Sequence, residues 1–214
     1  MAEASPACQA SMAQVRGQLA TLPTISLMAV RDGEVLFSYG AVDRANQVYS
    51  VRKNVLAMMY GPPVAAGTIS LDSSLASLDI DDVGGLLPLE RSAKVGDLLA
   101  ARSSVYHLAA NPGDDAETAP PLTRAADMHP PSAARRQLDY GLMWWIPALP
   151  ADSPLAGAYM AWGYYGQFIL VVPKQRMVIS HQRVVTAAEG SAPRKVSPAE
   201  FLRIANMLVQ SPCL

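Results

Sequence analysis

The order of elements along the chain predicts an α+β fold, with strands towards both ends and helices at the two termini and in the middle. Strand-like apolar runs occupy residues 24–30 and 34–39 and return within residues 140–184. Helical patterns occupy residues 9–21, the stretch after Ser50 and the C-terminus. The sequence therefore predicts a helix, two strands, a helical portion, three or so strands and a final helix.

The first two strands are predicted to form a hairpin. Asp32-Gly33 separates the apolar runs at residues 24–30 and 34–39. A two-residue Asp-Gly connection favours the tight turn that joins antiparallel neighbours, because both positions tolerate a positive φ. We therefore expect these strands to pair directly.

Later strands and a capped helix are predicted in the C-terminal third. The strands are expected at residues 140–146, 158–162, 167–172 and 177–184, the last two joined by a reverse turn at residues 173–176. Ser197 and Glu200 have the spacing of a capping box, and Pro198 suits the first helical position. A C-terminal helix should therefore begin at this point.

The length and composition suit a single compact domain over residues 1–214, or at most two small ones. Half of the residues are hydrophobic and the net charge is -1, so no basic surface recommends nucleic acid as a partner. No apolar run reaches the roughly 18 residues of a membrane span, and no signal peptide is visible. The compartment stays open: periplasmic or secreted if a leader was removed, otherwise cytoplasmic. Residues 109–137, rich in Pro, Ala, Asp and Arg, are expected to form an irregular loop.

A possible nucleophile and base occur at Ser50 and Lys53. If the run after Ser50 is helical, the two side chains lie on one helix face, one turn apart. A lysine amine can then accept the serine proton, and the helix N-terminus favours a negative charge forming beside the hydroxyl. Serine and lysine at this spacing also occur by chance, and the alternative is a capping serine followed by a surface lysine.

Several segments, in order, resemble the serine beta-lactamase and penicillin-binding-protein superfamily, and within it the class C-like esterases and 6-aminohexanoate-dimer hydrolases. The resemblance covers roughly residues 15–110 and 138–210. It rests on the stretches at residues 25–40, 49–53 (Tyr49-Ser50-Val51-Arg52-Lys53), 67–72, 95–99, 140–145 and 163–167 (Gly163-Tyr164-Tyr165-Gly166-Gln167).

The resemblance implies an antiparallel sheet of about five strands flanked by the N- and C-terminal helices, with a reduced helical region beside it. Ser50 would be the acylated nucleophile and Lys53 its proton acceptor. The backbone N–H of Tyr164 would join that of Ser50 in an oxyanion hole, and Gly163 would leave the backbone open to substrate.

Two departures from the family pattern bear on activity. Where many relatives carry Lys-Thr-Gly or His-Thr-Gly, this chain reads Ala161-Trp162-Gly163, which argues against efficient recognition of beta-lactams. The family's tyrosine motif would lie between about Ala110 and Tyr140, where this chain has no tyrosine, so general-acid assistance of about 10²–10⁴-fold is lost. The side chains of Trp162, Tyr164 and Tyr165 are predicted either to pack within the sheet or, for at least one of them, to line a pocket.

The remaining pocket candidates are Tyr106 and His107, in a segment that borders the active site of the relatives. His107, His129 and His181 lack the spacing of metal ligands, so no metal or other cofactor is predicted. Cys8 and Cys213 are the only cysteines. The resembling fold packs its terminal helices side by side, which implies a Cys8–Cys213 disulfide in an oxidising compartment, the alternative being two free thiols.

Two classes of function follow from these observations. The first is a serine hydrolase that acts on a small ester or amide through a Ser50 acyl-enzyme, with Lys53 as general base. The second is a catalytically degenerate or truncated relative that binds a ligand or partner without turnover. The sequence indicates neither the substrate nor the oligomeric state.

Overall fold

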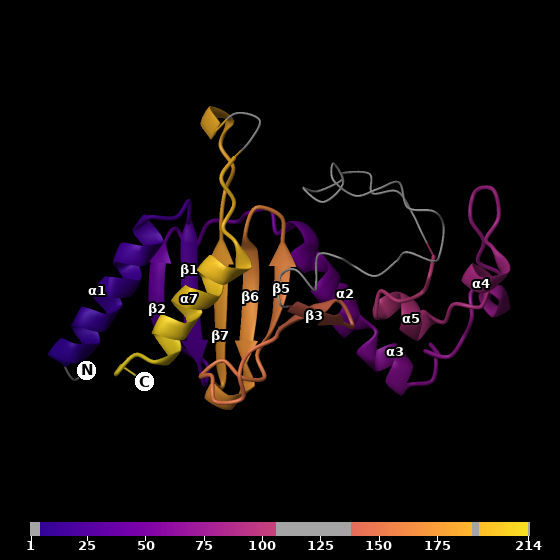
Figure 1. Ribbon diagram of the computed structural model, residues 1–214, viewed down its shortest axis with the longest axis horizontal. Helices are drawn as coiled ribbons and strands as arrows, with labels where there is room; N and C mark the ends of the chain where they lie inside the picture. Colours follow the sequence, from indigo (N-terminus) through magenta and orange to yellow (C-terminus); the bar gives the residue numbers. More distant parts are fainter. Residues whose placement is uncertain (1–4, 106–137, 190–192, 214) are drawn as a thin grey trace. The chain divides into compact units, whose positions relative to one another are not determined.

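The computed structural model describes residues 5–105, 138–189 and 193–213, which form an α+β fold around a seven-stranded sheet (Figure 1). The strand order is β2-β1-β7-β6-β5-β4-β3, and the pairs with a resolved register are antiparallel. This confirms the predicted α+β class and the antiparallel sheet. The expected number of about five strands is wrong, because the sheet has seven.

The strands are β1 (Ser26–Arg31), β2 (Glu34–Gly40), β3 (Leu138–Gly141), β4 (Trp144–Pro147), β5 (Tyr159–Gly163), β6 (Gln167–Val172) and β7 (Met177–Gln182). The α-helices are α1 (Pro6–Ala20), α2 (Arg52–Met59), α3 (Gly61–Ala65), α4 (Pro88–Arg91), α5 (Val95–Leu99) and α7 (Pro198–Val209). Short 3-10 turns are η1 (Tyr49–Val51), η2 (Ala76–Leu78), η3 (Pro173–Gln175) and η4 (Ala187–Glu189).

The chain divides into two compact units. Unit 1 comprises residues 1–53 and 144–214, and unit 2 comprises residues 54–143. Unit 1 contains α1, α7 and most of the sheet. The two units are described separately below.

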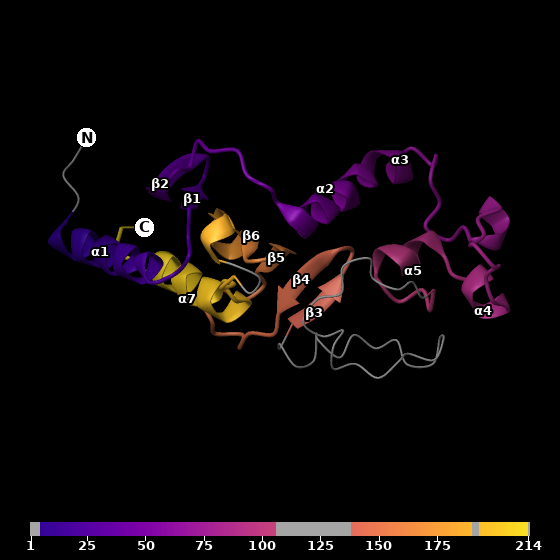
Figure 2. The ribbon, with the colours of Figure 1, turned by 90° about the horizontal axis from the view of Figure 1, so that it is seen from above.

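The core of unit 1 lies between the sheet and the terminal helices α1 and α7, which run side by side (Figure 2). The ring of Phe201 on α7 stacks on that of Phe168 on β6, with centroids 4.5 Å apart. Ser197 and Glu200 form the predicted capping box at the start of α7, which satisfies backbone N–H groups that the helix leaves unpaired.

The predicted hairpin at Asp32-Gly33 is present. Both residues have positive φ, 52° and 87°, as a two-residue turn between antiparallel strands requires. Strand β1 pairs with β2 on one side and β7 on the other. The N-terminal hairpin is thereby part of the main sheet.

One predicted strand is in fact two. The run at residues 140–146 is interrupted at Leu142 and Met143, whose φ angles are 49° and 66°, and this turn separates β3 from β4. Such turns favour Asn and Gly, so Leu-Met gives no local signal for one. This hidden turn is one reason why the sequence underestimates the number of strands.

A disulfide joins Cys8 on α1 to Cys213 beyond α7, with their Cα atoms 4.8 Å apart. This is the pair implied by the resemblance for an oxidising compartment. It links residues separated by 205 positions in the sequence, so it ties together the two helices that cover the same face of the sheet.

Unit 2 is built from short helices. Its buried apolar side chains are Leu75, Ala93, Val95, Leu99 and Leu138. Helix α2 ends at Met59 and α3 begins at Gly61, with Pro62 near its start, because a proline cannot continue the hydrogen bonding of the preceding helix. The Met and Leu residues that follow Lys53 do not contribute to this core, because Leu56, Met58 and Met59 are exposed.

Candidate functional site

Ser50 lies in η1, which is one turn of 3-10 helix immediately before α2. The turn is closed by a hydrogen bond from the Val51 N–H to the Val48 carbonyl, 3.1 Å long. Val51 is buried and anchors the turn, whereas Ser50 is half-buried. The hydroxyl is thus held on a fixed backbone at the beginning of a helix.

The end of β5 lies directly against this turn because Gly163 has no side chain. A Cβ at this position would lie 2.3 Å from the Val48 carbonyl oxygen and 3.3 Å from Val51 Cγ2. The first distance is far below any normal contact, so a larger residue would force η1 and β5 apart. Gly163 therefore brings the Ser50 turn next to the sheet.

Tyr49 holds a left-handed backbone conformation, with φ of 48°. For a bulky residue this costs roughly 1–2 kcal/mol, and such strain persists where surrounding contacts impose it. The ring makes edge-to-face contacts with Tyr164 and Tyr165, at centroid distances of 6.2 and 5.5 Å. The Tyr49 carbonyl accepts a hydrogen bond from Arg52 Nη1. We call Tyr49, Tyr164 and Tyr165 the tyrosine cluster.

The turn between β5 and β6 carries two members of this cluster. The Gly166 N–H donates to the Gly163 carbonyl, and both Tyr165 and Gly166 have positive φ, 66° and 106°. On its other side the turn meets Val196, whose N–H donates to the Tyr165 carbonyl. A Cβ on Gly166 would lie 2.7 Å from that of Val196. The turn is therefore held from both sides.

Cations flank the tyrosine cluster. Lys195 Nζ lies 4.7 Å from the centroid of the Tyr164 ring, and Arg183 Cζ lies 5.8 Å from that of Tyr165. Arg183 is buried and forms an ion pair with Glu189. The Thr186 N–H and Arg183 hold the pKa of Glu189 below its usual value.

Lys53 lies on α2, one turn beyond Ser50, and its side chain is exposed. Within the described parts of the chain, no hydrogen bond joins Ser50 Oγ to Lys53 Nζ. The predicted pair is therefore close in sequence, but it is not directly bonded in this conformation.

Trp162 belongs to the opposite face of the sheet. It stands across from Phe168 in the β5–β6 register and its ring also lies 5.3 Å from that of Trp145. Successive strand residues point to opposite faces, so Trp162 faces the side covered by α7 while Gly163 faces η1.

The predicted pocket residues Tyr106 and His107 lie outside the described residues.

Tyr49 and His181 lie near the candidate site, but the sequence did not predict a role for either residue. Tyr49 had one available signal, its position next to Ser50. His181 had none, because its contacts depend on the pairing of β6 with β7.

Among the described residues, no group of His, Cys, Asp and Glu is suited to hold a metal ion. None of the described helices combines the length and apolar character needed to cross a bilayer.

No family model and no curated protein matches this chain. A solved structure named "Putative 6-aminohexanoate-dimer hydrolase from Bacillus anthracis" aligns with it at a TM-score of 0.47 and 11% sequence identity. The alignment covers 90% of this chain and 80% of that one. A likeness of this extent does not establish a shared fold or activity.

Proposed function

We propose that this protein is a serine hydrolase that cleaves a small ester or amide through an acyl-enzyme on Ser50. The observation that supports this most directly is the packing of the Ser50 turn against Gly163, beside the tyrosine cluster. This packing presents a half-buried hydroxyl at a helix N-terminus, next to the backbone of a tightly held turn. The proposed chemistry uses no metal or other cofactor.

Ser50 Oγ would attack the substrate carbonyl while Lys53 accepts the Ser50 hydroxyl proton. The bond to the alcohol or amine leaving group would then break to give the acyl-enzyme, and water would hydrolyse the acyl-enzyme to release the acid and restore Ser50. Because the Lys53 side chain is exposed and not bonded to Ser50, transfer requires a change of side-chain rotamer or an intervening water. Long or unformed catalytic hydrogen bonds are common in unliganded enzymes and tighten when substrate binds. Lys53 therefore remains the proposed base.

The oxyanion would be stabilised by the backbone N–H groups of Ser50 and Tyr164. Each such donor typically contributes roughly 3–4 kcal/mol in the transition state. The support for Tyr164 is that its ring contacts that of Tyr49, the residue before Ser50. Its amide belongs to the turn that Gly163 brings against η1.

The leaving group is expected to decide which substrates react. No tyrosine occurs between Tyr106 and Tyr140, so the family's general acid is missing. Activated esters need little protonation of the leaving group, whereas amides and beta-lactams need much more. We therefore expect hydrolysis of p-nitrophenyl butyrate and little or no hydrolysis of the corresponding amide.

Kinetics with matched variants test the proposal. Ser50→Ala should reduce p-nitrophenyl butyrate hydrolysis to the uncatalysed rate, and Lys53→Ala should lower it by about 100-fold or more. Ser38→Ala and Lys174→Ala, which alter exposed residues away from the site, should leave the rate unchanged. Intact-mass analysis after fluorophosphonate treatment should show one adduct, on Ser50.

A second function is favoured by the missing tyrosine and by the exposed Lys53. In this case the protein is a catalytically degenerate relative that binds a ligand without turnover. Equal rates for the parent, Ser50→Ala and Lys53→Ala, together with no adduct on Ser50, would favour this alternative over the hydrolase.

A further inference from the structure

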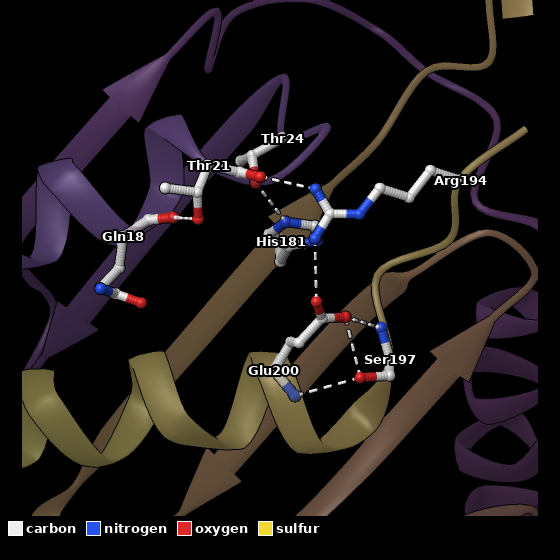
Figure 3. Close-up of polar contacts among 7 residues, drawn as sticks. All are labelled: Gln18, Thr21, Thr24, His181, Arg194, Ser197 and Glu200. Carbon is white, nitrogen blue, oxygen red and sulfur yellow. Dashed lines mark hydrogen bonds and ion pairs between the residues drawn. The ribbon is translucent and has the colours of Figure 1, made fainter.

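His181 lies within the core of unit 1, on strand β7 and near the start of helix α7 (Figure 3). Its exposed fraction is 1%. Its ring lies beside the stacked rings of Phe168 and Phe201, at centroid distances of 6.0 and 5.9 Å. A polar ring in such surroundings needs partners for both nitrogens, because unsatisfied buried polar groups are costly.

Both nitrogens of His181 have partners. Nδ1 lies 2.7 Å from the Gly166 carbonyl oxygen, and Nε2 lies 3.0 Å from Thr24 Oγ1. A carbonyl oxygen can only accept a hydrogen bond, so the proton must be on Nδ1. In the neutral ring Nε2 then accepts from the Thr24 hydroxyl. Burial lowers the pKa of His181 to about 4, so the ring is neutral at neutral pH.

The carbonyl held by His181 belongs to the turn that carries Tyr164 and Tyr165. Gly166 ends this turn and is buried. Two of its successive residues have positive φ, so the turn depends on outside contacts to keep its shape. The bond from Nδ1 provides such a contact from the core side, opposite the tyrosine cluster.

We infer that His181 is a positioning residue for the candidate site, whose Nδ1–H holds the Gly166 carbonyl and thereby fixes the Tyr164 amide and the tyrosine cluster beside Ser50. For its effect on Ser50 the inference rests on the proposed function. His181 touches neither Ser50 nor the tyrosine cluster in this scheme and acts through the backbone of the turn.

Two amide substitutions separate the two hydrogen bonds of His181. The side-chain nitrogen of asparagine is separated from Cβ by the same number of bonds as Nδ1 of histidine. His181→Asn therefore keeps a hydrogen-bond donor for the Gly166 carbonyl. The side-chain amide of glutamine is one bond further from Cβ, at the position of histidine Nε2. His181→Gln therefore keeps only the contact with Thr24. Thr24→Val is the matched control, because it removes the hydroxyl but leaves the Nδ1 bond.

The first readout is the rate of fluorophosphonate labelling of Ser50. We expect His181→Asn and Thr24→Val to label within about threefold of the parent. His181→Gln should label about 10- to 100-fold more slowly, since small misplacements of reacting groups have effects of this size. Equal slowing in His181→Asn and His181→Gln, or no slowing in either, would overturn the inference.

The second readout does not depend on catalysis. NMR signals of the Tyr164 and Gly166 amides should shift in His181→Gln and stay near their parent positions in His181→Asn. If the parent protein is not labelled at Ser50, the proposed function fails, and these amide signals alone decide the role of His181. Unchanged signals in His181→Gln would overturn it.

The third readout uses the unmodified protein and covers the case in which His181→Gln does not fold. Nitrogen-15 shifts of the imidazole should show a neutral ring protonated on Nδ1, with coupling to the Gly166 carbonyl across the hydrogen bond. A ring protonated on Nε2 would overturn the inference.

Discussion

The close approach of η1 and β5 depends on the absence of a side chain at Gly163. In Gly163→Ala the added methyl group would lie 2.3 Å from the Val48 carbonyl oxygen, and backbone on both sides must move. We expect the free energy of unfolding to fall by about 1–3 kcal/mol, as measured by urea denaturation. Ser50 labelling should slow as well, because the two turns separate.

Gly17→Ala is the matched control for this substitution. Gly17 lies within α1 and a Cβ there would meet nothing within 4 Å. Alanine favours helix over glycine by roughly 0.5–1 kcal/mol, so this variant should be slightly more stable than the parent. A Gly163→Ala protein as stable as the parent would contradict the packing of η1 on β5.

His181 predicts a dependence of stability on pH. Its pKa is about 4 in the folded protein against 6.5 in a model peptide, so the unfolded chain binds the proton more readily between these values. The stability that it contributes is therefore complete above about pH 6.5 and falls as the pH is lowered towards 4. The pKa difference corresponds to about 3 kcal/mol.

Urea unfolding of the parent and of His181→Asn at pH 7 and pH 5 measures this contribution. The variant removes the titrating group, so its stability should fall less between the two conditions. The same loss in both proteins would show that other groups carry the pH dependence.

Only some residues of the candidate site could be predicted from the sequence. Ser50 was found by its spacing from Lys53, and Gly163 and Tyr164 by resemblance. The role of Tyr49 depends on a left-handed φ and on a turn far along the chain, and that of His181 depends on strand register. Such contacts have no local sequence pattern, because they are created by tertiary packing.

At the scale of elements, α2 shows that an apolar run in the sequence does not predict which residues of a helix are buried. The apolar run on α2 includes Val55, Leu56, Met58 and Met59, yet each of these residues is between 46% and 66% exposed. A run of apolar residues predicts a helix but does not show which faces are covered. By contrast, α7 and the first hairpin carried explicit capping and turn residues, and both were predicted correctly.

The exposed side of α2 should bind a hydrophobic dye. Replacing Met58 and Met59 together by Gln should reduce fluorescence of bound anilinonaphthalene sulfonate, because the contiguous apolar surface is interrupted. The free energy of unfolding should change by less than about 1 kcal/mol, since both side chains are already exposed.

Val83→Gln serves as the control for dye binding. Among the described residues, Val83 is the most exposed large apolar residue, at 98%, and its replacement should have little effect on the dye. Unchanged dye fluorescence in the double Met variant would contradict an accessible apolar surface on α2.

For the whole molecule, the Cys8–Cys213 disulfide is predicted to contribute strongly to stability in an oxidising compartment. It closes a loop of 205 residues, for which the chain-entropy model gives about 5 kcal/mol, less any strain in the native state. Reduction, or the double substitution of Cys8 and Cys213 by Ser, should lower the urea midpoint accordingly. Two free thiols in protein purified from an oxidising compartment would contradict the link.

The disulfide also changes what a break in the chain would do. Unit 1 is formed by residues 1–53 and 144–214, with unit 2 inserted between them. A protease that cuts unit 2 once, for example beside the exposed Val83, would leave two peptides joined through Cys8 and Cys213. The nicked protein would migrate as one species on a non-reducing gel and separate into two fragments on a reducing gel. Both halves of the sheet would stay tethered through α1 and α7, so a nick in the inserted unit need not release either half.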